Sequence, residues 1–176
     1  MREDAPTRPS SLYGMTKLAA ERVARSICPD SVVVRHFTVY GLGQRPDMAF
    51  HRFIAAALGG PRAPLFGDGT QVRDFTFAGD AVSATIAAAT RGEGAYNVGG
   101  GSPASLNDVL GHIGELTGRV RAAPPGAPGA GTRAPHLGGH GWARQDLGWA
   151  PAVGLREGFA LQLADMRATE AARGAA

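Results

Sequence analysis

The stretch Tyr13-Gly-Met-Thr-Lys17 lies near the start of a segment whose apolar residues recur at helical spacing. Tyr13 and Lys17 are four residues apart, so a helix brings both side chains to one face, one turn apart. Ser10 or Ser11 can cap such a helix at its N-terminus. The sequence therefore predicts a helix from about Leu12 to Ile27, with apolar positions at Leu12, Met15, Ala19, Val23 and Ile27.

The Tyr-x-x-x-Lys spacing has a specific chemical use. A lysine ammonium within a few ångströms of a phenol stabilises the phenolate form. Such a tyrosine can exchange protons with a sugar hydroxyl or carbonyl while a nicotinamide exchanges hydride. The same spacing is also common where a lysine simply extends along a helix surface. The Tyr13/Lys17 pair alone therefore does not identify the function, which has to be inferred from the surrounding sequence.

Outward from this helix, short strands and helices alternate along the chain, which is typical of an α/β fold. Ser31–Thr38 contains three consecutive valines and predicts a buried, parallel strand. The other predicted elements are a loop at 41–46, a helix from Asp47 to about Leu58, a short strand at Ala63–Phe66, a hairpin-type turn at Gly67–Gly69, a half-exposed strand at Gln71–Phe77, a helix capped by Asp80 and ending near Thr90, a strand at Ala95–Val98, a loop at Gly99–Gly101, a helix opened by the capping box Ser105–Asp108 and ending near Thr117, a helical turn at Trp142–Gly148, and a final helix from Leu155.

Bulk properties exclude several classes of protein. The 176 residues suit one domain, and the net charge of +3 is scattered, without the basic run of a nucleic-acid arm. Cys28 is the only cysteine, so neither an internal disulfide nor a cysteine metal site is possible. His136 and His140 lie among glycines without acidic partners, and we predict no metal site. No signal peptide or membrane span is recognisable, so we expect a cytoplasmic protein that binds neither nucleic acid nor membrane.

Five segments in order carry a resemblance to a known family. The region around Tyr13-Gly-Met-Thr-Lys17 resembles the catalytic-helix region of extended short-chain dehydrogenases/reductases, the NAD-dependent nucleotide-sugar epimerases and dehydratases. The sequence of Gln44–Met48 is most similar to members of the UDP-glucuronate 4-epimerase type, and the resemblance extends to the UDP-glucose 4-epimerase type. The matching segments are Pro6–Glu21, Arg35–Met48, Phe66–Phe75 (the pattern G-D-G-x-x-x-R-D-F), Tyr96–Ser102 (Y-N-V-G) and Asp146–Trp149 (D-L-G-W).

The resemblance implies roles for individual residues. Tyr13 matches the catalytic acid/base, and Lys17 matches the lysine that holds the nicotinamide ribose of NAD, so both are implied to contact the cofactor. Arg73 matches the arginine that binds the nucleotide diphosphate, a role that suits a guanidinium. An ion pair between Arg73 and a neighbouring aspartate is the alternative. Thr38, Gln44 and Arg45 are implied to lie near the nucleotide sugar.

The sequence departs from the family pattern before Tyr13. Members carry a G-x-x-G-x-x-G turn more than a hundred residues earlier, where it binds the dinucleotide pyrophosphate. Only 12 residues precede Tyr13 here. Gly99–Ala104 formally fits G-x-G-x-x-[GA], but the acidic residue expected about 20 positions later is absent. The implied fold is therefore the C-terminal portion of an extended short-chain dehydrogenase/reductase, α/β, with an incomplete Rossmann sheet.

This interpretation divides the chain into two parts. Residues 1–60 are expected to be a remnant of the Rossmann domain with the catalytic helix. Residues 61–176 are expected to form mainly the substrate-binding part, with a flexible loop at 122–141, where ten of 20 residues are Gly or Pro. An incomplete sheet leaves apolar surface uncovered. A homodimer, or a separate chain that supplies the Rossmann half, is the expected partner besides the nucleotide sugar.

Three functions stay open at this level. The first is a truncated NAD-dependent epimerase or dehydratase, with acid/base chemistry by Tyr13 and Lys17 and a partner for NAD. The second is a catalytically inactive pseudoenzyme or remnant that still binds a nucleotide sugar through Arg73. The third is an NAD-independent enzyme that reuses Tyr13.

Overall fold

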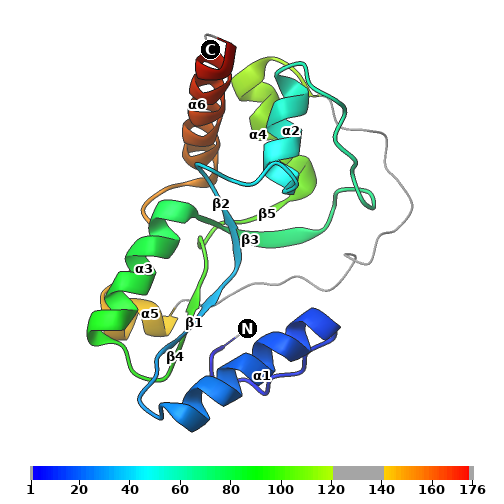
Figure 1. Cartoon of the computed structure of the whole chain (residues 1–176). Coiled ribbons are helices and arrows are strands. Elements are labelled where there is room, and N and C mark those ends of the chain that lie inside the picture. The colour runs from blue at the N-terminus through cyan, green and yellow to red at the C-terminus, as the bar shows by residue number, and fades with distance from the viewer. Residues whose placement is uncertain (1, 121–140, 175–176) are drawn as a thin grey trace.

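Two short sheets and the helices around them make up the α/β structure (Figure 1). The computed structural model describes residues 2–120 and 141–174. The elements in chain order are α1 (Leu12–Ile27), β1 (Val33–His36), β2 (Thr38–Tyr40), α2 (Ala49–Ala57), β3 (Val72–Phe77), α3 (Ala78–Arg91), β4 (Ala95–Val98), β5 (Pro103–Ser105), α4 (Leu106–Thr117), α5 (Gly141–Leu147) and α6 (Leu155–Gly174).

The valine-rich segment is not one strand but two that serve different sheets. The chain breaks at Phe37, so that β1 pairs with β4 and β2 pairs with β3. Both pairings are parallel, as predicted, with Val33 opposite Ala95 and Thr38 opposite Phe75. The expected burial was wrong, because the β1 valines are only half-buried. Among the described residues β1 has a strand on one side only, and this leaves its side chains partly open.

The second sheet has the order β2-β3-β5. β5 pairs antiparallel with β3 and was not predicted, because three residues beginning with Pro103 carry no strand pattern. The strand at β3 was predicted to be half-exposed, but its last four residues are buried. Its central place in the sheet, together with the packing of α3 and α6 against it, explains why its polar positions are buried as well.

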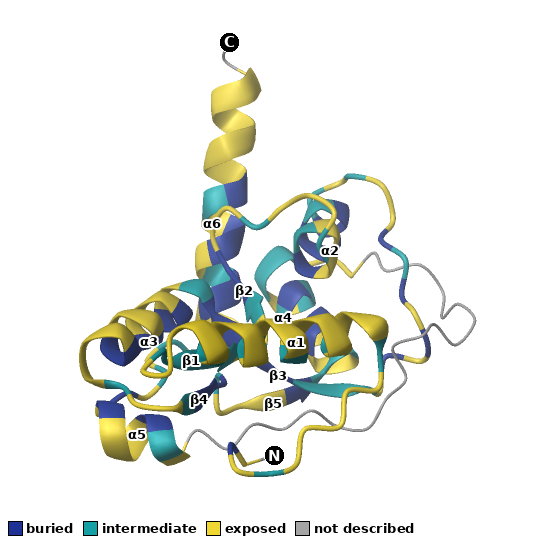
Figure 2. Cartoon of the chain, turned by 60° about the horizontal axis from the view of Figure 1, so that its bottom comes forward, coloured by how far each residue is buried: buried dark blue, intermediate teal, exposed yellow. Residues whose placement is uncertain are grey.

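The helix α1 has the predicted bounds, and the Ser11 hydroxyl accepts a hydrogen bond from the Gly14 N–H. No residue of this helix is buried. Its half-buried face carries Leu18 and Glu21, while the apolar side chains of Leu12, Met15, Val23 and Ile27 are exposed (Figure 2). Helical periodicity placed this apolar stripe correctly on one face, but the described residues do not cover it.

Most of the buried apolar side chains form one aromatic cluster between the second sheet, α2, α4 and α6. Tyr40 packs against Phe50, Phe77 and Phe159, with ring centroids 5.0–5.9 Å apart. A smaller cluster joins α3, β4 and α5 through Ala84, Tyr96, Leu147 and Trp149. The aromatic cluster also forms part of the wall of a pocket between β2, β3 and α2.

Two of the predicted helix caps were wrong. Helix α2 begins after Met48 and not after Asp47, and the N-cap of α3 is Phe77, three residues before the expected Asp80. The Asp80 carboxylate instead accepts hydrogen bonds from the N–H groups of Ala152 and Val153, both at 3.1 Å. The Asp80 side chain thus binds a segment that is distant in sequence, although local rules predict that it caps α3.

The remaining elements follow the sequence more closely. The capping box at Ser105 and Asp108 opens α4 as predicted, and the helices at 142–148 and from Leu155 are confirmed as α5 and α6. Gly67–Gly69 forms a turn, whereas the strand expected at Ala63–Phe66 is reduced to an isolated bridge at Ala63. The loop expected at 122–141 lies outside the described residues, apart from Gly141.

Candidate functional site

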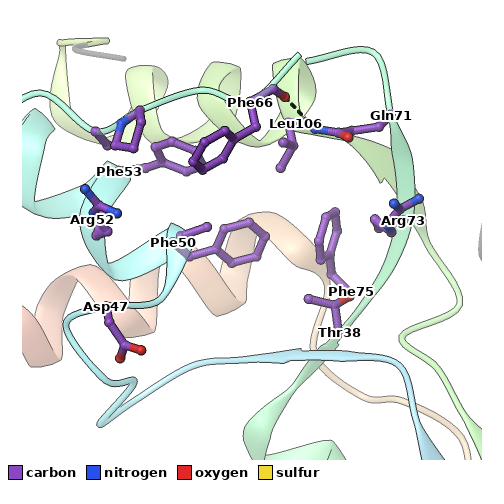
Figure 3. Close-up of a pocket in the computed structure, with 13 residues that line it drawn as sticks. Thr38, Asp47, Phe50, Arg52, Phe53, Phe66, Gln71, Arg73, Phe75 and Leu106 are labelled. Carbon is purple, nitrogen blue, oxygen red and sulfur yellow. Dashed lines mark hydrogen bonds between the residues drawn. The ribbon is translucent and has the colours of Figure 1, made fainter. Parts of the chain in front are cut away.

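A cavity of about 480 Å³ opens between β2, β3, α2 and the start of α4 (Figure 3). Side chains from five separate segments of the chain converge on it. The lining residues are Thr38, Asp47, Ala49, Phe50, Arg52, Phe53, Ala63, Pro64, Phe66, Gln71, Arg73, Phe75 and Leu106. The aromatic cluster supplies Phe50, Phe53 and Phe75 to its wall, so the core of the protein shapes the cavity directly.

The two ends of the cavity differ in chemistry. Phe53, Phe66 and Leu106 gather at one end, and Phe66 is 60% exposed there. Thr38 and Asp47 lie toward the opposite end (Figure 3). An apolar end with aromatic rings suits a flat aromatic group, and a polar end suits a hydroxylated one.

Arg73 lies in β3 at the side of the cavity (Figure 3). It is half-buried, and its Nη1 donates a hydrogen bond of 3.1 Å to the carbonyl oxygen of Val72. A guanidinium at this position can present donors to an anionic group in the cavity. The neighbouring Asp74 is buried and lies against the turn at Gly99.

The turn after Phe66 closes the rim beside the aromatic end. The Asp68 carboxylate accepts hydrogen bonds from the hydroxyl and N–H of Thr70, and these lower the pKa of Asp68. Gln71 donates to the Phe66 carbonyl oxygen at 3.0 Å. Gly69 has a φ of 77°, and a side chain there would collide with Asn107. The close approach of Asn107 thus requires glycine at position 69 of the G-D-G motif.

The other predicted substrate residues are divided between the cavity and its surroundings. Thr38 lines the cavity. Gln44 does not line it, because its side-chain oxygen accepts hydrogen bonds from the His51 N–H and from Gln162. Arg45 is exposed and forms an ion pair of 3.3 Å with Asp47, which does line the cavity.

Tyr13 and Lys17 lie apart from this cavity, on α1. The Tyr13 side chain is 71% exposed, and the Lys17 ammonium lies 5.3 Å from the centre of its ring. The helix therefore brings the pair together as the spacing predicted, but neither residue lines the cavity.

The structure also tests the glycine turn at Gly99–Gly101. A side chain at Gly99 would collide with the Asp74 carboxylate, and one at Gly100 with the Phe75 carbonyl oxygen. These glycines are required because two segments of this chain approach each other closely. This packing explains them without a dinucleotide.

Sequence reasoning missed several residues of the cavity wall. Asp47 was assigned to a helix cap, and Arg52 and Phe53 are helix residues without any distinguishing pattern. Phe66 stood inside the quoted G-D-G segment, which was the only signal available for it. Among the described residues no three His, Cys, Asp or Glu side chains group as metal ligands, and no described helix is long and apolar enough to cross a membrane.

The comparisons with known proteins agree with this architecture. Residues 1–99 match the model of the NAD dependent epimerase/dehydratase family. The chain belongs to this family. A Bacillus subtilis relative named "Uncharacterized UDP-glucose epimerase YtcB" is 36% identical over 170 residues, which are 92% of this chain and 54% of that protein. A UDP-glucuronate 4-epimerase from Thermodesulfobacterium geofontis is 40% identical over 117 residues, 63% of this chain and 36% of that enzyme.

Solved members of the family have the same arrangement of elements. MoeE5 in complex with UDP-glucuronic acid and NAD superposes with a TM-score of 0.90 and 41% identity, over 96% of this chain and 60% of that chain. UDP-glucuronic acid 4-epimerase from Bacillus cereus, in complex with UDP-glucuronic acid and NAD, gives a TM-score of 0.88 and 32% identity over 95% and 56%. The chain thus has part of the epimerase fold and spans roughly half the length of the relatives it matches over most of its own sequence.

Proposed function

We propose that this chain is the nucleotide-sugar-binding and acid/base part of an NAD-dependent epimerase or dehydratase. The observation that carries the proposal is the built cavity, in which Arg73 and Thr38 stand on a rigid aromatic base. A nucleotide sugar combines a flat base, a diphosphate and a hydroxylated ring. The apolar end, the Arg73 guanidinium and the polar end match these three groups in kind.

In this proposal Tyr13 and Lys17 act on the sugar and on NAD. The Tyr13 hydroxyl moves a proton to or from the sugar, and the Lys17 ammonium stabilises the phenolate and holds the nicotinamide ribose. NAD, when bound, supplies the hydride chemistry. The residues present fit the nicotinamide end of NAD only, since the glycines at 99–101 are packed against β3. We therefore assign the pyrophosphate of NAD to a dinucleotide-binding half outside these 176 residues.

A binding protein without catalysis is the second candidate. Its support is the exposure of Tyr13, which stands on a helix with no buried residue and outside the cavity wall. In that case Arg73 would still bind a nucleotide sugar, but Tyr13 would have no reacting group beside it. Both candidates keep the division at about residue 60, and the pocket takes six of its lining residues from before that point and seven from after it.

Calorimetric titration of the purified chain with UDP-glucose and, separately, with NAD⁺ tests the proposal. We expect UDP-glucose to bind, and Arg73→Ala to weaken it about tenfold or more, as for the loss of a hydrogen bond to a charged group. Arg73→Lys should recover part of the loss, because it keeps the charge but not the fork. Failure of the wild-type chain to bind UDP-glucose would overturn the proposal.

Lys17→Ala separates the cofactor question from the sugar question. We expect UDP-glucose affinity to survive this change and NAD⁺ to bind the isolated chain weakly at most. NAD⁺ binding that is tight and disappears in Lys17→Ala would mean that copies of this chain build a cofactor site together. Restored turnover with a dinucleotide-binding half, and its loss in Tyr13→Phe, would favour the enzyme over the binding protein.

A further inference from the structure

The loop between β2 and α2, residues 41–48, is held in place by the C-terminal helix α6. Asp165 of α6 accepts a hydrogen bond of 3.0 Å from the Gly43 N–H. Gln162, one turn earlier, donates through Nε2 to the Gln44 side-chain oxygen at 2.9 Å. The two contacts join segments about 120 residues apart in sequence. Two residues of α6 therefore hold the loop in place.

The Gln44 oxygen links this anchor to α2. It accepts the Gln162 amide and also the His51 N–H, at 3.0 Å. His51 lies in the first turn of α2, where N–H groups have no partner within the helix. Gln44 thus performs the capping that the sequence assigned to Asp47. Asp47 is left available to line the cavity.

The N-terminal end of α6 is held against β2, the strand that precedes this loop. The Tyr40 hydroxyl, at the end of β2, donates to the Leu155 carbonyl oxygen at 3.3 Å. Burial, with the negative charges of Asp80 and Glu157, raises the pKa of Tyr40, so the hydroxyl keeps its proton. A side chain at Gly158 would collide with that hydroxyl. Helix α6 therefore reaches the loop from a fixed position.

Burial of the Gln162 side chain opposes folding. It is 1% exposed, and its side-chain oxygen has no hydrogen-bond partner among the described residues. A buried polar atom without a partner opposes folding, whereas an apolar side chain of similar size does not. The part of Gln162 that is satisfied is the part that holds Gln44. The Gln162 side chain therefore stabilises the position of the loop, although its unpaired oxygen destabilises the core.

The loop in turn supplies the polar end of the cavity. Asp47 lines the cavity, and the exposed Arg45 pairs with it at 3.3 Å. Both residues lie within four positions of the anchored Gly43 and Gln44. A shift of the loop would move Asp47 and Arg45, whereas Phe53 is held in the buried aromatic cluster and Phe66 lies on a separate segment.

We propose that Gln162 and Asp165 are positioning residues that set the loop at residues 41–48 for recognition of the sugar of a bound nucleotide sugar. The proposal rests on the proposed function, since it assumes that the cavity takes such a ligand. It assigns the sugar to the polar end and the base to the aromatic end. Loss of the anchor should then weaken the sugar contacts and spare those of the nucleotide.

The test is to titrate UDP and UDP-glucose into the wild-type chain and into Gln162→Leu. We expect the variant to bind UDP within about twofold of wild type and UDP-glucose about five- to tenfold more weakly, the size of one positioned hydrogen-bonding group. Its urea midpoint should be equal to or higher than that of wild type, because the unpaired oxygen is gone. Amide exchange of residues 43–47 should become faster.

Asp165→Ala repeats the test at a half-buried position where folding is not at risk, with Glu170→Ala on the exposed end of α6 as the matched control. Asp165→Ala should weaken UDP-glucose selectively, and Glu170→Ala should change neither ligand. Equal weakening of UDP and UDP-glucose, or unchanged UDP-glucose affinity in both anchor variants, would overturn the inference alone. No binding of UDP-glucose by the wild-type chain would overturn the proposed function, and this inference with it.

Discussion

The helix α1 and the region around the cavity carry the two halves of the proposed chemistry, and they are built in opposite ways. The cavity stands on interlocked aromatic rings from β2, α2, β3 and α6, several of them less than 5% exposed. α1 has no buried residue, although it carries Tyr13 and Lys17. An ion pair of 2.7 Å between Glu21 and Arg35 joins this helix to β1. The proposed substrate pocket is thus shaped by the core, whereas the proposed acid/base pair stands on a helix without a buried residue.

This difference also separates two kinds of sequence signal. A motif such as Tyr-x-x-x-Lys depends only on local helix geometry, so it survives on a helix that the chain itself does not bury. The cavity depends on distant segments meeting, so its existence here requires the whole region from β2 to α6. Four substitutions test how differently the two regions are built.

The largest effect is expected for Phe159→Ala, in the cavity region. Phe159 is 0% exposed and packs on Tyr40 and Phe50 with ring centroids 5.0 Å apart. Removing the ring leaves a hole that the surrounding side chains fill incompletely. We expect the free energy of unfolding to fall by about 3–5 kcal/mol, measured by urea denaturation. A loss below 1 kcal/mol would mean that the aromatic base is much looser than its packing indicates.

Asp80→Ala tests the long-range contact that replaced the predicted cap. The carboxylate is 5% exposed and accepts two backbone N–H groups, from Ala152 and Val153. We expect a loss of about 1–3 kcal/mol in the free energy of unfolding, because both donors lose a charged acceptor. Asp80→Asn, which keeps one acceptor oxygen, should lose less. Equal stability of the two variants would contradict this account.

The capping box of α4 should give a smaller and pH-dependent effect. Ser105→Ala should lower the free energy of unfolding by about 1 kcal/mol at pH 7. Hydrogen bonds from the Ser105 hydroxyl and N–H lower the pKa of Asp108 below its ordinary 3.8. A lowered carboxyl pKa contributes stability above pH 3.8 that is lost as pH falls through the folded-state value. Urea titrations at pH 7 and below pH 3 should therefore show the difference between wild type and variant shrinking at the lower pH.

The smallest effect is expected for Leu12→Ala on α1. The side chain is 77% exposed, so the isolated chain should change by no more than about 0.5 kcal/mol. The measurement is urea denaturation at two protein concentrations. A clear loss of stability that grows with protein concentration would show that a second copy covers this face, and the contrast with the cavity region would then hold only for the monomer.

The sequence was most informative where structure depends on neighbouring residues. Bounds of α1, the Ser105 capping box, β4 and the Gly67–Gly69 turn follow from local rules, and the ordered motifs indicated the family. The sequence was least informative where distant segments compete for one side chain. Asp47 and Asp80 are good local caps, yet one lines the cavity and the other binds the segment before α6. Gln44, which also accepts a hydrogen bond from Gln162 more than a hundred residues away, binds the first turn of α2 in place of Asp47.

The candidate site divides along the same line. Arg73 and Thr38 could be named from motifs, and both line the cavity. Arg52 and Phe53 could not, because a helix residue shows no sign of the cavity it faces until the fold is known. The break at Phe37 was hidden for a related reason. A run of β-branched residues predicts extended backbone, but not which neighbour each half of the run will pair with.

The pairing of β1 with β4 alone, among the described residues, has a consequence for solubility and assembly. Val33 and Phe37 direct their N–H groups to the β4 side, so the backbone alternation of a strand turns the N–H groups of Val34 and His36 away from β4. An open strand edge is a template for another strand, including that of a neighbouring molecule. This edge is only four residues long, which suits the addition of one specific parallel strand better than indiscriminate stacking. We therefore expect the purified chain to self-associate increasingly as its concentration rises, and a segment that completes the sheet to reverse this.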